Sequence, residues 1–224
     1  MTLRALANTL LSSLFEPPCA ACARVLPNPW DGAVCEQCWG SIRTGAPLNE
    51  HPRGHAVEWA CAVDHYEGRL RDIIHALKYE RRRSIAKPLG LLMRERGQTV
   101  LLGADLVVPV PLHPRRERSR GFNQADDLAR QLGLPVAPLL RRVRFTMSQI
   151  ELPADARHQN VRDAFALTDA CGDEPLGSSI KVAVLVDDVS TTGATLEACA
   201  RVLKRGGVRE VRALTAARVV TGRR

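Results

Sequence analysis

The chain has 224 residues, of which 45% are apolar and 25% are charged, and its formal net charge at pH 7 is +8. This composition excludes a disordered or low-complexity chain, and the length suits one main domain with a small appended module. The positive charge favours acidic partners such as phosphates, nucleotides or nucleic acid, but it does not choose among them.

The N-terminal segment is predicted to form an amphipathic helix. Leu3, Leu6, Leu10 and Leu14 recur at helical spacing with polar residues between them, which favours a helix packed on the body over a secretory signal. No stretch approaches the roughly 20 apolar residues that a membrane span needs. We therefore expect a cytoplasmic protein without a membrane span.

Four cysteines then follow with the spacing of a zinc ribbon. Cys19 and Cys22 form one C-x2-C pair, and Cys35 and Cys38 form the second. Proline, asparagine and glycine residues between the pairs favour a turn that folds one pair onto the other. Because four thiolates complete a tetrahedral site, we expect a structural Zn²⁺ ion. Redox dithiols and incidental cysteines are the alternatives.

The other cysteines, Cys61, Cys171 and Cys199, have no partner at such spacing and are predicted to be ordinary small residues of the core. His51 and His55 follow the ribbon closely, but we expect exposed loop residues there and not further metal ligands.

Strand and helix patterns alternate beyond the ribbon. The strands have continuous apolar cores, which are typical of a parallel sheet covered by helices on both faces. A basic loop is expected after the second strand, and residues 144–165, which show little periodicity, are expected to form a functional loop or lid. Strands are predicted at residues 55–68, 104–111, 182–188 and 208–219, and helices at 69–80, 85–97, 123–133 and 193–207.

The strand at 182–188 ends on two adjacent acids, Asp187 and Asp188, and runs into a small hydroxyl-rich loop that opens a helix. Ligands of parallel α/β sheets bind at the carboxyl ends of strands, and helix N-termini attract anions. The loop offers donors for a phosphate, and the acids can accept hydrogen bonds from a sugar diol, so together they suit a ribose 5-phosphate. The predicted phosphate loop consists of Ser190, Thr191, Thr192, Gly193, Ala194 and Thr195.

Two alternatives for the acid pair are an ordinary strand end and a metal-binding site. Because both carboxylates follow the apolar part of the strand, we expect them to lie outside the core. Replacing both by asparagine should then abolish ligand binding and leave the fold intact.

The segment Ala183–Thr195 resembles the ribose-phosphate signature of type I phosphoribosyltransferases, which has four apolar residues, two acids and a Thr/Gly-rich loop. With "VPVPLHPRR", "RGFNQADDLA", "ARHQNVRDAF" and the four-cysteine ribbon, nearly the whole chain resembles the ComF/GntX family of phosphoribosyltransferase-like proteins. The resemblance implies a zinc-ribbon module at residues 1–56, a phosphoribosyltransferase-like domain at 57–224, and a link to competence and DNA uptake.

The resemblance also implies that a nitrogen acceptor displaces pyrophosphate from 5-phosphoribosyl 1-pyrophosphate with Mg²⁺. Asp187 and Asp188 would hold the ribose, and a flexible loop with Gln149, Arg157 and Asn160 would close over it, although the last two residues could instead cap a helix. The acceptor and any catalytic residue stay unassigned. The pyrophosphate is expected to contact His113, Arg115, Arg116, Arg120 and Lys78.

A second function stays open. The chain could be a non-catalytic nucleotide sensor, or a competence factor that handles single-stranded DNA with its zinc ribbon and basic surface. Positive charge is concentrated in Lys78–Arg83, His113–Arg120 and Leu139–Arg144, although such runs often form only a solvated face. Nucleic-acid affinity with a steep salt dependence would favour this second function.

Overall fold

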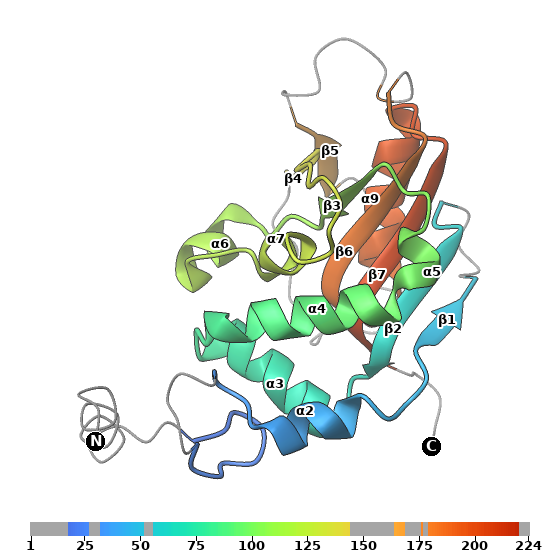
Figure 1. Ribbon diagram of the computed structural model, residues 1–224. Coiled ribbons are helices and arrows are strands. Elements are labelled where there is room, and N and C mark those ends of the chain that lie inside the picture. The colour runs from blue at the N-terminus through green and yellow to red at the C-terminus, as the bar shows by residue number, and fades with distance from the viewer. Residues whose placement is uncertain are drawn as a thin grey trace, which may run out of the picture.

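The computed structural model describes residues 18–26, 32–51, 56–143, 164–168, 176 and 179–219. At its centre is a five-stranded sheet with the strand order β1–β2–β7–β6–β3 (Figure 1). Strands β2, β7, β6 and β3 are parallel, and β1 pairs antiparallel at the edge. The bounds are β1 (Leu48–Glu50), β2 (Trp59–His65), β3 (Leu106–Pro109), β6 (Val182–Ser190) and β7 (Glu210–Arg218).

Helices cover both faces of this sheet. On one face α4 contacts β2 and β7, and α7 contacts β3 and β6, while α9 packs against β6 and β7 on the other face (Figure 1). A two-stranded sheet, β4 with β5, lies beside α9. The bounds are α2 (Glu36–Ile42), α3 (Gly68–Tyr79), η1 (Arg83–Ile85), α4 (Ala86–Arg96), α5 (Gln98–Leu101), α6 (Pro114–Arg120), α7 (Gln124–Ala129), β4 (Leu140–Arg142), β5 (Phe165–Leu167) and α9 (Ala194–Arg205).

The pleat of β6 divides the apolar interior into two cores. Val184 and Val186 face a core shared with α3, α4 and α7, and Ala183 and Leu185 face a core shared with α9. All four side chains are fully buried. Because both faces of the strand are covered, its sequence is continuously apolar until Asp187, where the sheet meets the candidate site.

The predicted parallel α/β sheet with helices on both faces is confirmed. The predicted basic loop is wrong, because Pro114–Arg120 forms helix α6. His113 caps this helix, since its Nδ1 accepts a hydrogen bond from the Arg115 N–H at 3.2 Å, and a proline at the first helical position has no N–H to leave unpaired. The sequence signals for a capped helix were therefore present within the basic run.

The ends of two elements also differ from the prediction. β6 continues to Ser190, and α7 ends at Ala129 rather than near Gly133. Cys61 and Cys199 are buried as predicted. The predicted N-terminal helix, the segment 144–163, Cys171 and His55 lie outside the described residues. Within the described part of the chain, no helix combines the length and apolar character needed to cross a bilayer.

Candidate functional site

The candidate site lies at the carboxyl end of β6. Asp187 and Asp188 are consecutive strand residues, so their side chains leave opposite faces of the sheet. Asp188 points toward α3, where it meets Lys78, and Asp187 lies across the sheet register from Thr215 on β7. The two acids therefore follow the last residue of β6 that pairs with β3 and lie near the carboxyl end of β6, which is the end at which such sheets bind ligands.

Asp188 forms a buried ion pair with Lys78. The Lys78 Nζ lies 2.7 Å from Asp188 Oδ1, and the side chains are only 15% and 5% exposed. Burial alone would lower the pKa of Lys78, but the attraction of Asp188 outweighs it and raises that pKa. The expectation that both acids lie outside the core is therefore wrong for Asp188.

The second oxygen of the same carboxylate has a different environment. Asp188 Oδ2 is buried, and among the described residues it has no hydrogen-bond partner. A buried carboxylate oxygen normally accepts at least one hydrogen bond, because leaving it unpaired costs about 1–3 kcal/mol. This atom therefore has an unused hydrogen-bond acceptor position within the described part of the chain.

Asp187 is half-buried, and its Oδ1 accepts a hydrogen bond from the Asp188 N–H at 2.8 Å. Burial raises the pKa of Asp187 to about 7, and the neighbouring charge of Asp188 adds to this effect, while Lys78 opposes it. At neutral pH the carboxyl of Asp187 is therefore close to its titration point.

The loop after β6 turns into α9 through Gly193. This residue has φ of +75°, in the left-handed region that glycine adopts without strain, and it caps the twelve-residue helix. No described atom lies within 4 Å of the place where a Cβ would stand. The Ala194 N–H donates to Thr192 Oγ1 at 3.4 Å. No described side chain therefore covers the backbone at Gly193, where α9 begins. The N–H groups at a helix N-terminus attract an anion, so this position suits one.

Basic residues face this edge from the end of β3. The Val110 N–H donates to Val186 O at 2.9 Å, which holds the start of the basic segment beside β6. Burial and the charges of Arg142, Arg115 and Arg116 lower the pKa of His113. These positive groups are therefore close enough to influence the charge of one another.

Two of the residues that are expected to contact pyrophosphate make other contacts in the structure. Lys78 pairs with Asp188, and Arg120 donates to Gln124 Oε1 while its guanidinium lies 5.4 Å from the centre of the Tyr79 ring. Gln149, Arg157 and Asn160 lie outside the described residues.

The four ribbon cysteines form one cluster. Their Sγ atoms all lie within 4.8 Å of one another, and those of Cys22 and Cys35 are 3.8 Å apart. A tetrahedral site with zinc–sulfur bonds of about 2.3 Å has sulfur–sulfur edges of roughly 3.8 Å. The cluster therefore fits a metal ion such as Zn²⁺.

The protonation of the cluster also suits metal binding. Burial by itself raises the pKa of the Cys19 thiol, but hydrogen bonds from backbone N–H groups, led by that of Cys35, lower it to about 6. Burial and the neighbouring thiols raise the pKa of Cys38. One thiolate is thus available at neutral pH, and a bound cation would favour deprotonation of the others.

Known proteins resemble this chain over most of its length. A family model described as phosphoribosyl transferase domain matches residues 118–224. DNA utilization protein YhgH from Salmonella typhimurium is 35% identical over 208 residues, which are 86% of each chain. Competence protein F from Haemophilus influenzae is 34% identical over 66% of this chain and 68% of its own. Competence protein ComFC from Bacillus subtilis is 34% identical over 79% and 80%, respectively.

This chain belongs to the ComF/GntX family. It therefore contains a phosphoribosyltransferase domain, and the relatives named above link the family to competence and DNA utilization.

In this ComF/GntX protein the structure adds one residue that the sequence analysis did not single out. Arg142 lies on β4 with its guanidinium 5.2 Å from the centre of the Phe165 ring. Burial, followed by the charge of Arg116, lowers the pKa of Arg142, and the charge of Arg142 in turn lowers the pKa of Asp187 slightly. The sequence places Arg142 within a basic run that is typical of a solvated face. Its inward position on a short strand is what distinguishes it.

Proposed function

We propose that this protein binds 5-phosphoribosyl 1-pyrophosphate, or a related ribose 5-phosphate ligand, at the carboxyl end of β6 and transfers its phosphoribosyl group to a nitrogen acceptor. The observation that carries the proposal is the buried Asp188 Oδ2, which has no partner among the described residues while Lys78 holds Oδ1. A ribose hydroxyl is a donor of the right kind, and a ribose that lies over the edge of the sheet, between the two faces from which the acids project, would present its neighbouring hydroxyl to Asp187.

The 5-phosphate would lie on the loop from Ser190 to Thr195. The open backbone at Gly193 and the N-terminus of a twelve-residue helix support this placement. Threonine hydroxyls in the same loop supply further donors. The acid pair and the phosphate loop are adjacent in sequence, so a single ribose 5-phosphate can reach both.

The pyrophosphate would lie over the end of β3, near His113, Arg115 and Arg116. The mutual effect of these charges on the pKa of His113 supports a shared anion site. Arg142 faces the same region and would contribute a further positive charge. Mg²⁺ prefers carboxylate and phosphate oxygens, so Asp187 and Asp188 fit its chemistry, and when bound it would neutralise charge on the pyrophosphate.

In the proposed reaction the acceptor nitrogen forms a bond to C1 of the ribose. The C1–O bond to pyrophosphate breaks, pyrophosphate keeps the electron pair, and the nitrogen releases a proton to solvent. The developing positive charge on the ribose ring is stabilised by the carboxylates, and the leaving anion is stabilised by the basic residues. Positioning of the acceptor and the ribose next to each other supplies the remaining rate acceleration, so no nucleophile of the protein is required.

We further propose that residues 1–56 form a zinc-ribbon module beside a phosphoribosyltransferase-like domain at 57–224. Two hydrogen bonds support its docking on the domain: Arg69 on α3 donates to Ala21 O, and Arg82 Nη1 donates to Pro18 O at 2.7 Å. The strand β1 lies in the first range and pairs with β2, so the two parts share the edge of the sheet.

Calorimetry with 5-phosphoribosyl 1-pyrophosphate and Mg²⁺ tests the binding proposal. We expect the wild type to bind and Asp187→Asn to bind about tenfold more weakly, because a charged acceptor is lost. Asp105→Asn is the matched control, since Asp105 is exposed and accepts from the Lys181 and Val182 N–H groups at the opposite end of β6. Absence of wild-type binding would overturn the proposal.

A second candidate function is binding of single-stranded DNA, and one specific observation favours it. Two of the basic runs meet in space: Arg81 Nη2 donates to Ser119 O at 3.1 Å, and the Arg120 guanidinium lies over the ring of Tyr79, which is 58% exposed. An exposed aromatic ring among arginines suits stacking of a base and contact with its phosphate. The names of the relatives agree with this candidate.

A further inference from the structure

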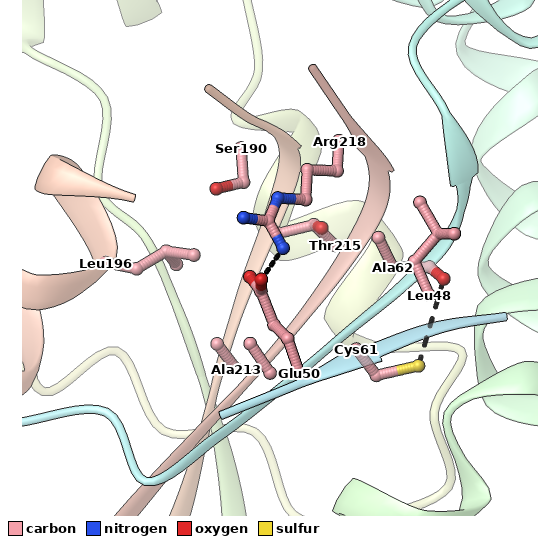
Figure 2. A pocket seen from close by; sticks show the side chains of 10 residues that line it. Leu48, Glu50, Cys61, Ala62, Ser190, Leu196, Ala213, Thr215 and Arg218 are labelled. Carbon is pink, nitrogen blue, oxygen red and sulfur yellow. Dashed lines mark hydrogen bonds and ion pairs between the residues drawn. The ribbon is translucent and has the colours of Figure 1, made fainter. Parts of the chain in front are cut away.

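A small pocket lies beside the start of the phosphate loop, between β1, β2, β7 and the first turn of α9 (Figure 2). Ala60, Ala62 and Ala213 line it with methyl groups only, and the hydroxyl residues Ser190 and Thr215 line its side nearest β6. Its enclosed volume is about 10 Å³, which is near the least that holds one water molecule. A larger molecule enters only if a lining side chain moves.

The side chains that can move are Glu50 and Arg218. Arg218 Nη1 donates to Glu50 Oε2, and this ion pair spans the pocket (Figure 2). The Glu50 side chain is 31% exposed, and the Arg218 side chain is 34% exposed. Partly exposed ion pairs contribute little to stability because water screens them, so the two groups can part at small cost.

The pocket adjoins the proposed ribose site. Thr215 is the Cα partner of Asp187, and Arg218 is the Cα partner of Ser190, in the register of β6 with β7. Hydrogen bonds from the Tyr66 N–H to Arg218 O and from the Val219 N–H to Ser190 O fix the backbone here at 2.7 and 2.8 Å. A molecule in the pocket would therefore lie next to a ribose held by the acids.

We propose that this pocket binds the acceptor, and that Glu50 and Arg218 select a flat nitrogen heterocycle whose ring has an N–H donor beside a carbonyl acceptor. This inference rests on the proposed function, because an acceptor must lie next to the ribose. Binding of such a ring would replace the Glu50–Arg218 ion pair by two hydrogen bonds: Glu50 would accept one from the ring N–H, and Arg218 would donate one to the ring carbonyl. Once the two side chains part, the face of the ring would lie against the alanine methyl groups along the sheet.

The test is equilibrium binding of uracil to the full-length protein, with and without ribose 5-phosphate. Pyrimidine, which has neither the N–H nor the carbonyl, is the matched ligand. The variant Glu50→Arg with Arg218→Glu keeps an ion pair in reversed order, so it separates recognition from stability. The control variant Asp126→Arg with Arg130→Asp reverses an exposed pair on and after α7.

We expect uracil to bind at least about tenfold more tightly than pyrimidine, and the reversed Glu50–Arg218 pair to lose this difference. The control variant should bind uracil as the wild type does. Equal binding of the two rings, or unchanged uracil binding after reversal, would overturn the inference. If the wild type and its variants fail to bind ribose 5-phosphate while uracil binding still depends on the pair, the proposed function fails and the pocket assignment stands.

Discussion

The Nζ atom of Lys78 on α3 lies 2.7 Å from Oδ1 of Asp188 on β6, and both side chains are largely buried. This ion pair joins the helix that follows β2 to the strand end at which we place the ribose. It fixes one carboxylate oxygen, while Oδ2 of the same group is buried without a hydrogen-bond partner among the described residues. The pair therefore links the packing of α3 to the geometry of the candidate site.

The first prediction is that Lys78→Met destabilises the protein by about 3–5 kcal/mol, because it leaves a buried carboxylate without its cation. Chemical unfolding measures the change. Lys87→Met on α4 is the matched control, since Lys87 is exposed, and it should change the free energy of unfolding by about 0.5 kcal/mol or less. A similarly small change in the free energy of unfolding for both substitutions would show that the ion pair does not stabilise the fold.

This pair also changes how the acids should be tested. Asparagine at both Asp187 and Asp188 would leave Lys78 buried without a counter-charge, so loss of ligand binding could reflect loss of the fold. Asp187→Asn alone avoids this problem, because Asp187 makes no ion pair with Lys78 in the structure. For Asp188, the combined variant Asp188→Asn with Lys78→Gln removes both charges together.

The second prediction concerns pH. Asp187 has a pKa of about 7 in the folded protein, against roughly 4 for an unfolded chain. Between these values the folded protein binds more protons, so this residue's contribution to the free energy of unfolding falls as pH rises from about 4 to about 7. Asp187→Asn removes this pH-dependent loss of stability. The Tm of the variant minus the Tm of the wild type should therefore increase as pH increases from 5 to 8.

Thermal unfolding at a series of pH values measures this difference. A domain of this size shifts by about 2–4 °C per kcal/mol, so a gain of several degrees is expected. Asp105→Asn is the control: hydrogen bonds from the Val182 and Lys181 N–H groups lower the pKa of Asp105, so its contribution is lost only as pH falls through the acid range. A pH-independent Tm difference for Asp187→Asn would contradict the raised pKa.

Much of this site could be predicted from local sequence. The continuous apolar run of β6 and the two acids after it predicted a buried parallel strand with a ligand at its end, and the glycine in the loop marked the turn into α9. These signals are local, because a strand end and a helix start depend on neighbouring residues. The spacing of the four cysteines was equally informative, since a metal site requires its ligands in pairs.

The parts that the sequence did not predict depend on contacts between distant segments. Lys78 and Asp188 are 110 positions apart, and no local pattern relates them. The same holds for Glu50 with Arg218, whose meeting depends on β2 lying between β1 and β7. Helix α6 differs for another reason: its run of arginines is typical of a basic loop as well as of a helix, and the capping hydrogen bond at His113 is visible only in the structure.

The third prediction is that the purified protein contains about one zinc ion per chain and that Cys19→Ser abolishes this. The substitution removes one ligand of the four-sulfur cluster, and the ribbon should lose stability because metal binding and folding are coupled. Metal analysis and limited proteolysis measure the two effects. Cys61→Ala is the control, because Cys61 is buried in the sheet and should leave the zinc content unchanged. A wild-type protein that lacks zinc would contradict the assignment.

The fourth prediction tests the surface at which the basic runs meet. Tyr79→Ala should weaken binding of a fluorescent oligothymidine by about 5- to 150-fold, because stacking of one base contributes about 1–3 kcal/mol. Arg120→Ala should weaken binding and lower the slope of log affinity against log salt by about 0.7, as expected for one phosphate contact with a single strand. Fluorescence anisotropy at several salt concentrations measures both.

Arg201→Ala is the matched control for that experiment, because Arg201 is exposed on α9 and pairs with Glu197, away from Tyr79. It should leave affinity and salt slope nearly unchanged. Equal losses in Arg120→Ala and Arg201→Ala, with no loss in Tyr79→Ala, would mean that DNA responds only to net charge, and the surface around Tyr79 would then have no special role. A loss confined to Tyr79→Ala and Arg120→Ala, with binding of 5-phosphoribosyl 1-pyrophosphate unchanged, would place DNA and the sugar phosphate at separate sites on one chain.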